Sequence, residues 1–202
     1  MYHERMRIGV FGGTFDPVHL GHLILAEQCR EQGRLDQVWF VPAARPPHKS
    51  EAELTPFAQR VEMLQLAIAG QPAFRVEEIE RDRPGPSYTA VTLEELSQRH
   101  SEHTWFLLVG GDTVRDLPGW YEPQRIVAVA KLLVMARPGA VMPSTEELQA
   151  RMGAAVEMQL VDVPMIGVAS SDLRHRVREG RSVRYMMPRA VEAYVRDKRL
   201  YG

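Results

Sequence analysis

An apolar run, a glycine-rich turn and a pair of histidines together constrain the fold of this chain most strongly. Residues 6–11 have the continuous apolar character of a buried strand, and residues 20–34 are long enough for a helix. The turn that joins them reads Gly12-Gly13-Thr14-Phe15-Asp16-Pro17-Val18-His19-Leu20-Gly21-His22. A helix that starts after such a turn presents free backbone N–H groups and the positive end of its dipole. The segment therefore predicts a phosphate site.

The two histidines strengthen this prediction. His19 and His22 are three positions apart, so both rings would lie on one face of the first helical turn and could reach phosphate oxygens. The turn is neither a Gly-x-Gly-x-x-Gly fingerprint nor a P-loop, which needs Gly-Lys-Ser/Thr. A zinc site lacks support, because Cys29 is the only cysteine and no third ligand follows nearby. No protein metal site is predicted, although Asp16 is the best carboxylate candidate, with fixing the turn as its alternative role.

Composition limits the class of partner. The 202 residues carry 25 Lys and Arg against 26 Asp and Glu, and this balance argues against a nucleic-acid polymer or an anionic membrane as the partner. The single cysteine excludes an intrachain disulfide and fits a reducing cytoplasm. No run approaches the roughly 20 apolar residues that a membrane helix needs, and we expect no signal peptide.

Strand-like and helix-like segments alternate along the chain. Further strands are expected at residues 37–42, 74–79, 104–109, 132–135 and 156–161. Further helices are expected at residues 55–70, with Thr55 as N-cap, and at 87–100, 126–130, 146–152, 171–179 and 188–199. This order predicts an α/β, Rossmann-like, doubly wound fold with a mostly parallel sheet and helices on both faces. We expect a single domain over residues 1–202, with a C-terminal helical part at about 170–202.

Several polar or aromatic residues follow predicted strands, where open parallel sheets bind ligands. His48 and Lys49 follow the second strand, with an exposed loop as the alternative. Asp112 follows the strand at 104–109 and could bind ribose hydroxyls or cap a helix. Trp120, in a Pro-Gly turn, could stack on an aromatic ligand. Arg174 would oppose the helix dipole unless a polyphosphate binds there, whereas the serines before it are ordinary caps.

The Val18-His19-Leu20-Gly21-His22 stretch resembles the (Thr/His)-x-Gly-His signature of the nucleotidylyltransferase superfamily. Within that superfamily, the chain resembles the bacterial nicotinate mononucleotide adenylyltransferases over nearly its whole length. The resemblance implies transfer of the adenylyl group of ATP to nicotinate mononucleotide, giving deamido-NAD and pyrophosphate. It also implies Mg²⁺ held mainly by the ATP phosphates, and it leaves a homo-oligomer open.

The same resemblance assigns site residues. The implied catalytic residues are His19, His22 and Arg174. The implied ATP-binding residues are Gly12, Gly13, Thr14, Phe15, Asp16, His19, Gly21, His22, Gly110, Asp112, Ser170, Ser171 and Arg174. The implied mononucleotide-binding residues are His48, Lys49, Tyr88, Thr89, Asp112, Trp120 and Tyr121.

Three positions depart from the family pattern. Val91 stands where the family has Asp, Ala169 replaces a Ser, and Ser171 replaces a Thr. Two alternatives follow: a phosphopantetheine adenylyltransferase, which shares the first motif, and a nucleotide-binding protein without catalytic activity. The Pro-Pro-His-Lys and Ser-Tyr-Thr elements and Trp120 argue against the first, and the two histidines with Arg174 argue against the second.

Overall fold

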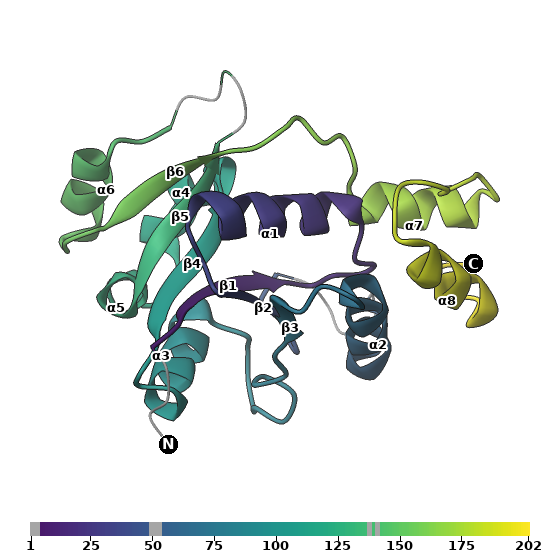
Figure 1. Ribbon diagram of the computed structural model, residues 1–202, viewed down its shortest axis with the longest axis horizontal. Helices are drawn as coiled ribbons and strands as arrows, with labels where there is room; N and C mark the ends of the chain where they lie inside the picture. The colour runs from purple at the N-terminus through teal and green to yellow at the C-terminus, as the bar shows by residue number, and fades with distance from the viewer. Residues whose placement is uncertain (1–4, 49–53, 137–138, 140–141) are drawn as a thin grey trace.

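A parallel β-sheet forms the centre of the molecule (Figure 1). The computed structural model describes residues 5–48, 54–136, 139 and 142–202. Within these ranges the sheet has six strands in the order β3-β2-β1-β4-β5-β6, and every neighbouring pair is parallel. The strands are β1 (Arg7–Gly13), β2 (Gln37–Pro42), β3 (Phe74–Val76), β4 (Thr104–Gly110), β5 (Ala130–Ala136) and β6 (Met158–Asp162). The expected doubly wound α/β fold is confirmed.

Helices cover both faces of this sheet, because alternate residues of the buried strands present apolar side chains to each face. The helices on one face are α1 (Leu20–Gln32), α2 (Phe57–Ile68), α7 (Ser170–Arg178) and α8 (Arg189–Asp197). Those on the other face are α3 (Thr89–Arg99), α4 (Gly111–Asp116), the 3₁₀ helix η2 (Leu117–Gly119), α5 (Pro123–Val129) and α6 (Thr145–Met152). Two hydrophobic cores result, one on each side of the sheet.

The strand order places a topological switch point between β1 and β4. The chain runs outward from β1 to β2 and β3, then crosses to β4 on the other side of β1 and continues to β5 and β6. The loops after β1 and β4 therefore diverge to opposite faces and leave a crevice at the carboxyl ends of the two strands. The predicted glycine turn follows β1, and the Gly110–Asp112 segment follows β4.

Helices α7 and α8 pack beside the first turn of α1 (Figure 1). Val191 and Val195 of α8 share a core with Met63 and Leu64 of α2, and Leu173 of α7 belongs to the same core. This packing brings the last 30 or so residues to the carboxyl end of β1. None of the helices in the described ranges is both long enough and apolar enough to cross a membrane.

Several expected element boundaries are wrong; strand β5, for example, begins at Ala130 rather than at residue 132. Strand β3 ends at Val76 rather than at residue 79, because a turn closed by the Arg81 N–H on the Glu78 carbonyl follows. Strand β6 begins at Met158 rather than at residue 156. The N-cap of α2 is Pro56 and not Thr55, and the Thr55 N–H donates to the Asp16 carboxylate.

Candidate active site

Gly13 and Gly21 occupy positions where a larger residue would collide with the site. A Cβ on Gly13 would come within 2.9 Å of the Phe15 ring, which folds back beneath the turn with a φ of 51°. A Cβ on Gly21 would come within 2.9 Å of Nδ1 of His19. The two glycines therefore let an aromatic ring and an imidazole lie against the backbone of the turn.

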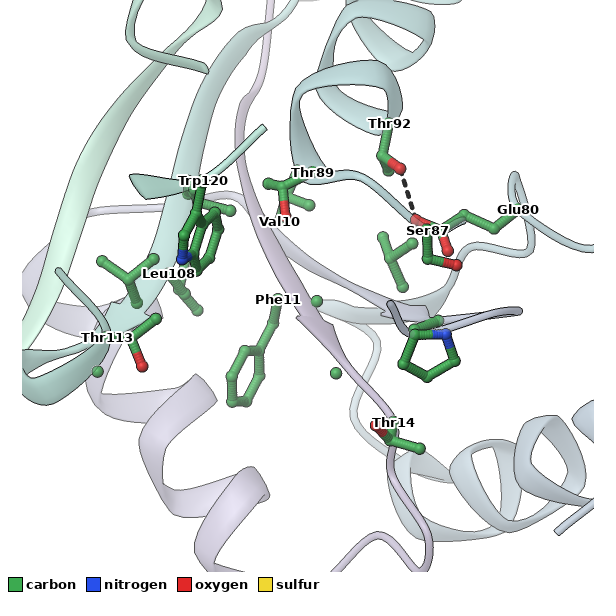
Figure 2. Close-up of a pocket in the computed structure, with 18 of the residues that line it drawn as sticks. Val10, Phe11, Thr14, Glu80, Ser87, Thr89, Thr92, Leu108, Thr113 and Trp120 are labelled. Carbon is green, nitrogen blue, oxygen red and sulfur yellow. Dashed lines mark hydrogen bonds between the residues drawn. The ribbon is translucent and has the colours of Figure 1, made fainter. Parts of the chain in front are cut away.

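The turn borders a cavity of about 320 Å³ at the carboxyl ends of β1 and β4 (Figure 2). Val10 and Phe11 of β1 and Leu108 of β4 form part of its floor. The residues at its rim come from four separate segments and include Gly12, Gly13, Thr14, Pro46, Pro47, Ser87, Thr89, Gly110, Thr113 and Trp120. The structure therefore contains the crevice that the strand order predicts.

The two histidines lie together at the start of α1. Their rings stack with centroids 3.7 Å apart and planes 29° apart, so they share one face, as predicted. His19 is the N-cap residue, and its backbone N–H donates to Nδ1 of His22 at 3.2 Å. Since Nδ1 of His22 accepts this bond, the proton of the neutral ring resides on Nε2 and can be donated to a ligand.

Burial keeps both imidazoles neutral in the free protein. Loss of contact with water lowers the pKa of His19 to about 4. Burial, helped by repulsion from His19, lowers the pKa of His22 to about 3. The rings therefore offer N–H donors rather than positive charges until a polyanion approaches.

The start of α7 is bonded to the same turn, although more than 150 residues separate them. Ser170 Oγ donates to the Pro17 carbonyl at 2.9 Å, and Arg174 Nη1 donates to the Asp16 carbonyl at 2.7 Å. The expectation that one of the serines caps α7 is wrong, because the N-cap is Ala169 and the Ser170 hydroxyl bonds to Pro17 instead. Arg174 is thereby placed beside the histidine turn with its positive charge intact.

Asp16 serves to fix the turn. It is 1% exposed, and its two carboxylate oxygens accept hydrogen bonds from the Tyr201 hydroxyl at 2.6 Å and the Thr55 N–H at 3.2 Å. The alternative as a direct metal ligand has no support in these contacts.

Gly110 and Asp112 border a smaller hollow of about 120 Å³ next to the main cavity. Leu25 of α1, Met135 of β5 and Val163 line its apolar side. Asp112 is exposed in the first turn of α4, while the N-cap is Gly110 without a side-chain bond. The alternative of Asp112 as a helix cap is therefore wrong, and its carboxylate faces solvent at the rim.

The residues expected to hold a mononucleotide line a second cavity of about 380 Å³. Thr89 and Trp120 line both this cavity and the main one, so the two cavities adjoin. Tyr88 and Tyr121 stack with ring centroids 4.2 Å apart on its wall. His48 is exposed at the same cavity, and the predicted Lys49 lies outside the described residues.

Ser87 holds this wall to the loop after β2. Its hydroxyl accepts the Arg45 N–H at 2.9 Å, and its own N–H donates to the Arg45 carbonyl at 2.8 Å. A serine just before a helix is typical of an N-cap, but the N-cap of α3 is Tyr88, which makes no side-chain cap bond.

Sequence reasoning missed Glu80 at the main cavity. Its side chain is 5% exposed and accepts hydrogen bonds from the Thr92 hydroxyl and the Ala44 N–H (Figure 2). Glu80 lies in a segment dense with charged residues, and nothing in that pattern distinguishes it from a solvated surface acid. Its position just beyond β3, at the carboxyl end of the sheet, was the only signal.

The parallel sheet, with a glycine turn and two stacked imidazoles at its switch point, defines an α/β protein of Rossmann-like fold. The cytidylyltransferase-like family model matches residues 10–176. A relative from Thermomicrobium roseum, named "probable nicotinate-nucleotide adenylyltransferase", is 46% identical over 196 residues, covering 96% of this chain and 91% of the relative. One of the same name from Thermus thermophilus is also 46% identical, covering 97% of this chain and 100% of the relative. This chain therefore belongs to the cytidylyltransferase-like family and, within it, to the nicotinate-nucleotide adenylyltransferases.

The fold is also that of solved structures. The Plasmodium falciparum nicotinic acid mononucleotide adenylyltransferase complexed with NaAD superposes with a TM-score of 0.78 and covers 98% of both chains at 18% identity. The same enzyme complexed with APC gives a TM-score of 0.78 at 17% identity. At these identities the likeness establishes the shared architecture alone.

Proposed function

We propose that this chain transfers the adenylyl group of ATP to nicotinate mononucleotide, giving deamido-NAD and pyrophosphate. The supporting observation is the stacked pair His19 and His22 at the start of α1, with Arg174 bonded to the same turn, whose first residues line the main cavity. The relatives at 46% identity, matched over nearly their whole length, are named for this activity.

The nucleophile needs no general base. A phosphomonoester has its second pKa near ~6 and is mostly a dianion at neutral pH. One of its oxygens attacks the α-phosphorus of ATP, and the bond from that phosphorus to the β-phosphate bridging oxygen breaks. Pyrophosphate leaves with the electron pair of that bond. The protein therefore has to position the two substrates and neutralise the departing charge.

The two histidines and Arg174 supply that neutralisation. The Nε2–H of His22 can donate to a phosphate oxygen, and the backbone N–H groups at the start of α1 add a fixed dipole. Arg174 contributes a permanent positive charge because its guanidinium does not deprotonate. A bound polyphosphate would also raise the pKa of both imidazoles toward protonation.

Mg²⁺ would be held mainly by the ATP phosphates, and it would supply further neutralisation of their charge. Mg²⁺ usually keeps several waters and binds through substrate phosphates with few protein ligands. The side chains fit this arrangement, because the buried carboxylates of Asp16 and Glu80 already accept hydrogen bonds from the protein. Asp112 is exposed at the rim, where we assign it to ribose hydroxyls.

The main cavity would hold ATP. The second cavity, lined by Tyr88, Trp120 and Tyr121 and called the aromatic cavity below, would hold the mononucleotide. On the ATP side we place the glycine turn and Gly110, which line the main cavity, and Asp112 in the smaller hollow. The starts of α1 and α7 do not line these cavities, and we assign them to ATP because they adjoin or bond to the same turn. On the mononucleotide side, the half-buried Trp120 would stack on the pyridine ring, beside Thr89 and the Tyr88–Tyr121 pair. The preference for the nicotinate ring, a role for His48 and Lys49, a cytoplasmic setting and any homo-oligomer remain predictions.

The decisive experiment is pyrophosphate release with ATP and Mg²⁺, comparing nicotinate mononucleotide, nicotinamide mononucleotide and phosphopantetheine. We expect strong turnover of nicotinate mononucleotide only. Turnover of phosphopantetheine would contradict the proposal and indicate the related adenylyltransferase. ATP binding without turnover of any acceptor would contradict it in favour of a non-catalytic nucleotide-binding protein.

A further inference from the structure

We propose that Tyr201 is a positioning residue for His19 and His22, and that it acts through the carboxylate of Asp16. This inference rests on the proposed adenylyl transfer, since it assigns a role in that site to a side chain from the far end of the sequence. Tyr201 lines neither cavity, so its effect would be exerted through the turn.

Asp16 is the point where segments from distant parts of the chain meet. The hydroxyl of Tyr201 donates to its Oδ1 at 2.6 Å, and the Thr55 N–H donates to its Oδ2 at 3.2 Å. Its backbone carbonyl accepts Nη1 of Arg174 at 2.7 Å. One buried residue, three positions before His19, therefore receives three donors from outside its own turn.

A buried cation lies beside the same turn. Arg60 is 1% exposed, and its guanidinium donates to the Thr55 carbonyl at 3.0 Å and the Thr14 carbonyl at 2.9 Å. Burial lowers the pKa of Arg60, while attraction to Asp16 counteracts that lowering. An anion buried next to a cation needs every hydrogen bond that the site offers, because each lost donor leaves an oxygen without solvation.

The tyrosine hydroxyl is well suited to be a constant donor. Burial and the hydrogen bond to Asp16 raise the pKa of Tyr201 far above its usual value. The hydroxyl therefore keeps its proton throughout the pH range in which the enzyme would work. The ring packs against the core shared with α7 and α8, which holds the hydroxyl oxygen next to Asp16.

Loss of the Tyr201 hydroxyl would change the positions of the two histidines. Oδ1 of Asp16 would be buried without its hydroxyl partner, so the carboxylate and the turn would shift toward another donor. Only Pro17 and Val18 separate Asp16 from His19, whose backbone N–H orients the His22 ring. A displacement of the turn therefore moves the two imidazoles relative to the α-phosphate.

The test is the Tyr201→Phe variant, which retains the ring and removes one hydroxyl. We expect kcat to fall on the order of ten- to a hundredfold, the scale of rate loss when reacting groups are misplaced. KM for the mononucleotide should stay within about twofold, since the aromatic cavity is untouched. The matched control is Tyr185→Phe, a tyrosine that is 81% exposed, and it should behave as the wild type.

A second readout does not depend on turnover. The imidazole NMR signals of His19 and His22, assigned by single substitutions, should shift in Tyr201→Phe and stay in place in Tyr185→Phe. A kcat within twofold of wild type, or a lower kcat with unshifted histidine signals, would overturn the inference. A wild type that lacks adenylyl transfer would refute the proposed function alone, because the histidine signals would still decide the role of Tyr201.

Discussion

At the scale of single residues, the two neutral histidines make stability depend on pH. An unfolded histidine titrates near ~6.5, whereas burial lowers the pKa of His19 to about 4 and of His22 to about 3. Below the unfolded pKa the unfolded chain binds more protons than the native one. The contribution of the two rings to the free energy of unfolding is therefore fully present above about pH 6.5. It is lost as the pH falls toward about 4, by up to about 1.4 kcal/mol per pH unit for each ring.

Urea unfolding of the free protein at several pH values between about 4.5 and 7.5 measures this slope. The His22→Gln variant should show a shallower slope than the wild type, because one of the two titrating rings is gone. Equal slopes in the two proteins would show that His22 is not held neutral by burial.

At the scale of elements, α6 shows a cap whose sequence signature and structure agree. Ser144 Oγ accepts the Glu147 N–H at 3.1 Å, and Glu147 Oε2 accepts the Ser144 N–H at 2.8 Å, a reciprocal capping box. Ser144→Ala should lower the free energy of unfolding by about 1 kcal/mol and leave kcat unchanged, because α6 lies away from both cavities. The exposed Ser101 offers the control, Ser101→Ala, with no expected change. Equal unfolding midpoints for the two variants would contradict the assignment of the cap.

At the scale of the whole molecule, charge is divided unevenly along the chain. Residues 170–202 contain nine Lys and Arg against four Asp and Glu, although the whole chain has 25 against 26. Helix α7, with three Arg against one Asp, lies beside the start of α1, where the triphosphate would arrive (Figure 1), whereas α8 carries two Arg against two acidic residues. Exposed charges of this kind attract a polyanion over about 10 Å at 0.1 M salt and less at higher salt.

We therefore expect kcat/KM for ATP to fall as KCl is raised from about 20 to 300 mM, with kcat changing much less. A charge-reversed pair on the exposed α8 surface, Arg189→Glu with Arg196→Glu, should flatten this dependence. A salt dependence that stays the same in that variant would show that the C-terminal helices do not steer the nucleotide.

Local patterns predicted most of the secondary structure, because the buried strands are continuous apolar runs and the turns contain glycine and proline. The wrong cap predictions share one cause. Thr55, Ser87 and Ser170 each look like a helix cap in sequence, yet none of them is the N-cap residue. Each bonds instead to a group distant in the chain, Thr55 through its N–H and the two serines through their hydroxyls. A cap is a local signal, and tertiary contacts override it wherever a better partner lies near in space.

Some residues of the candidate site could likewise be predicted from local sequence, and others could not. The turn at Gly12–Gly13 and the pair His19 and His22 could be predicted, since a spacing of three residues on a helix fixes their relative position. The buried Glu80 and Arg60 could not, because charged residues in a polar stretch look like solvated surface groups until the fold encloses them.

By itself, the sequence determined the order of strands and helices, the phosphate turn after β1 and the shared face of the two histidines, because backbone periodicity and short spacings decide these features. The tertiary structure alone decided what holds that turn in place. Asp16 meets Thr55, Arg174 and Tyr201 there, and Arg60 is buried beside them. Contacts between residues up to 185 positions apart depend on how α2, α7 and the last residues pack on the sheet, and no local pattern encodes that packing.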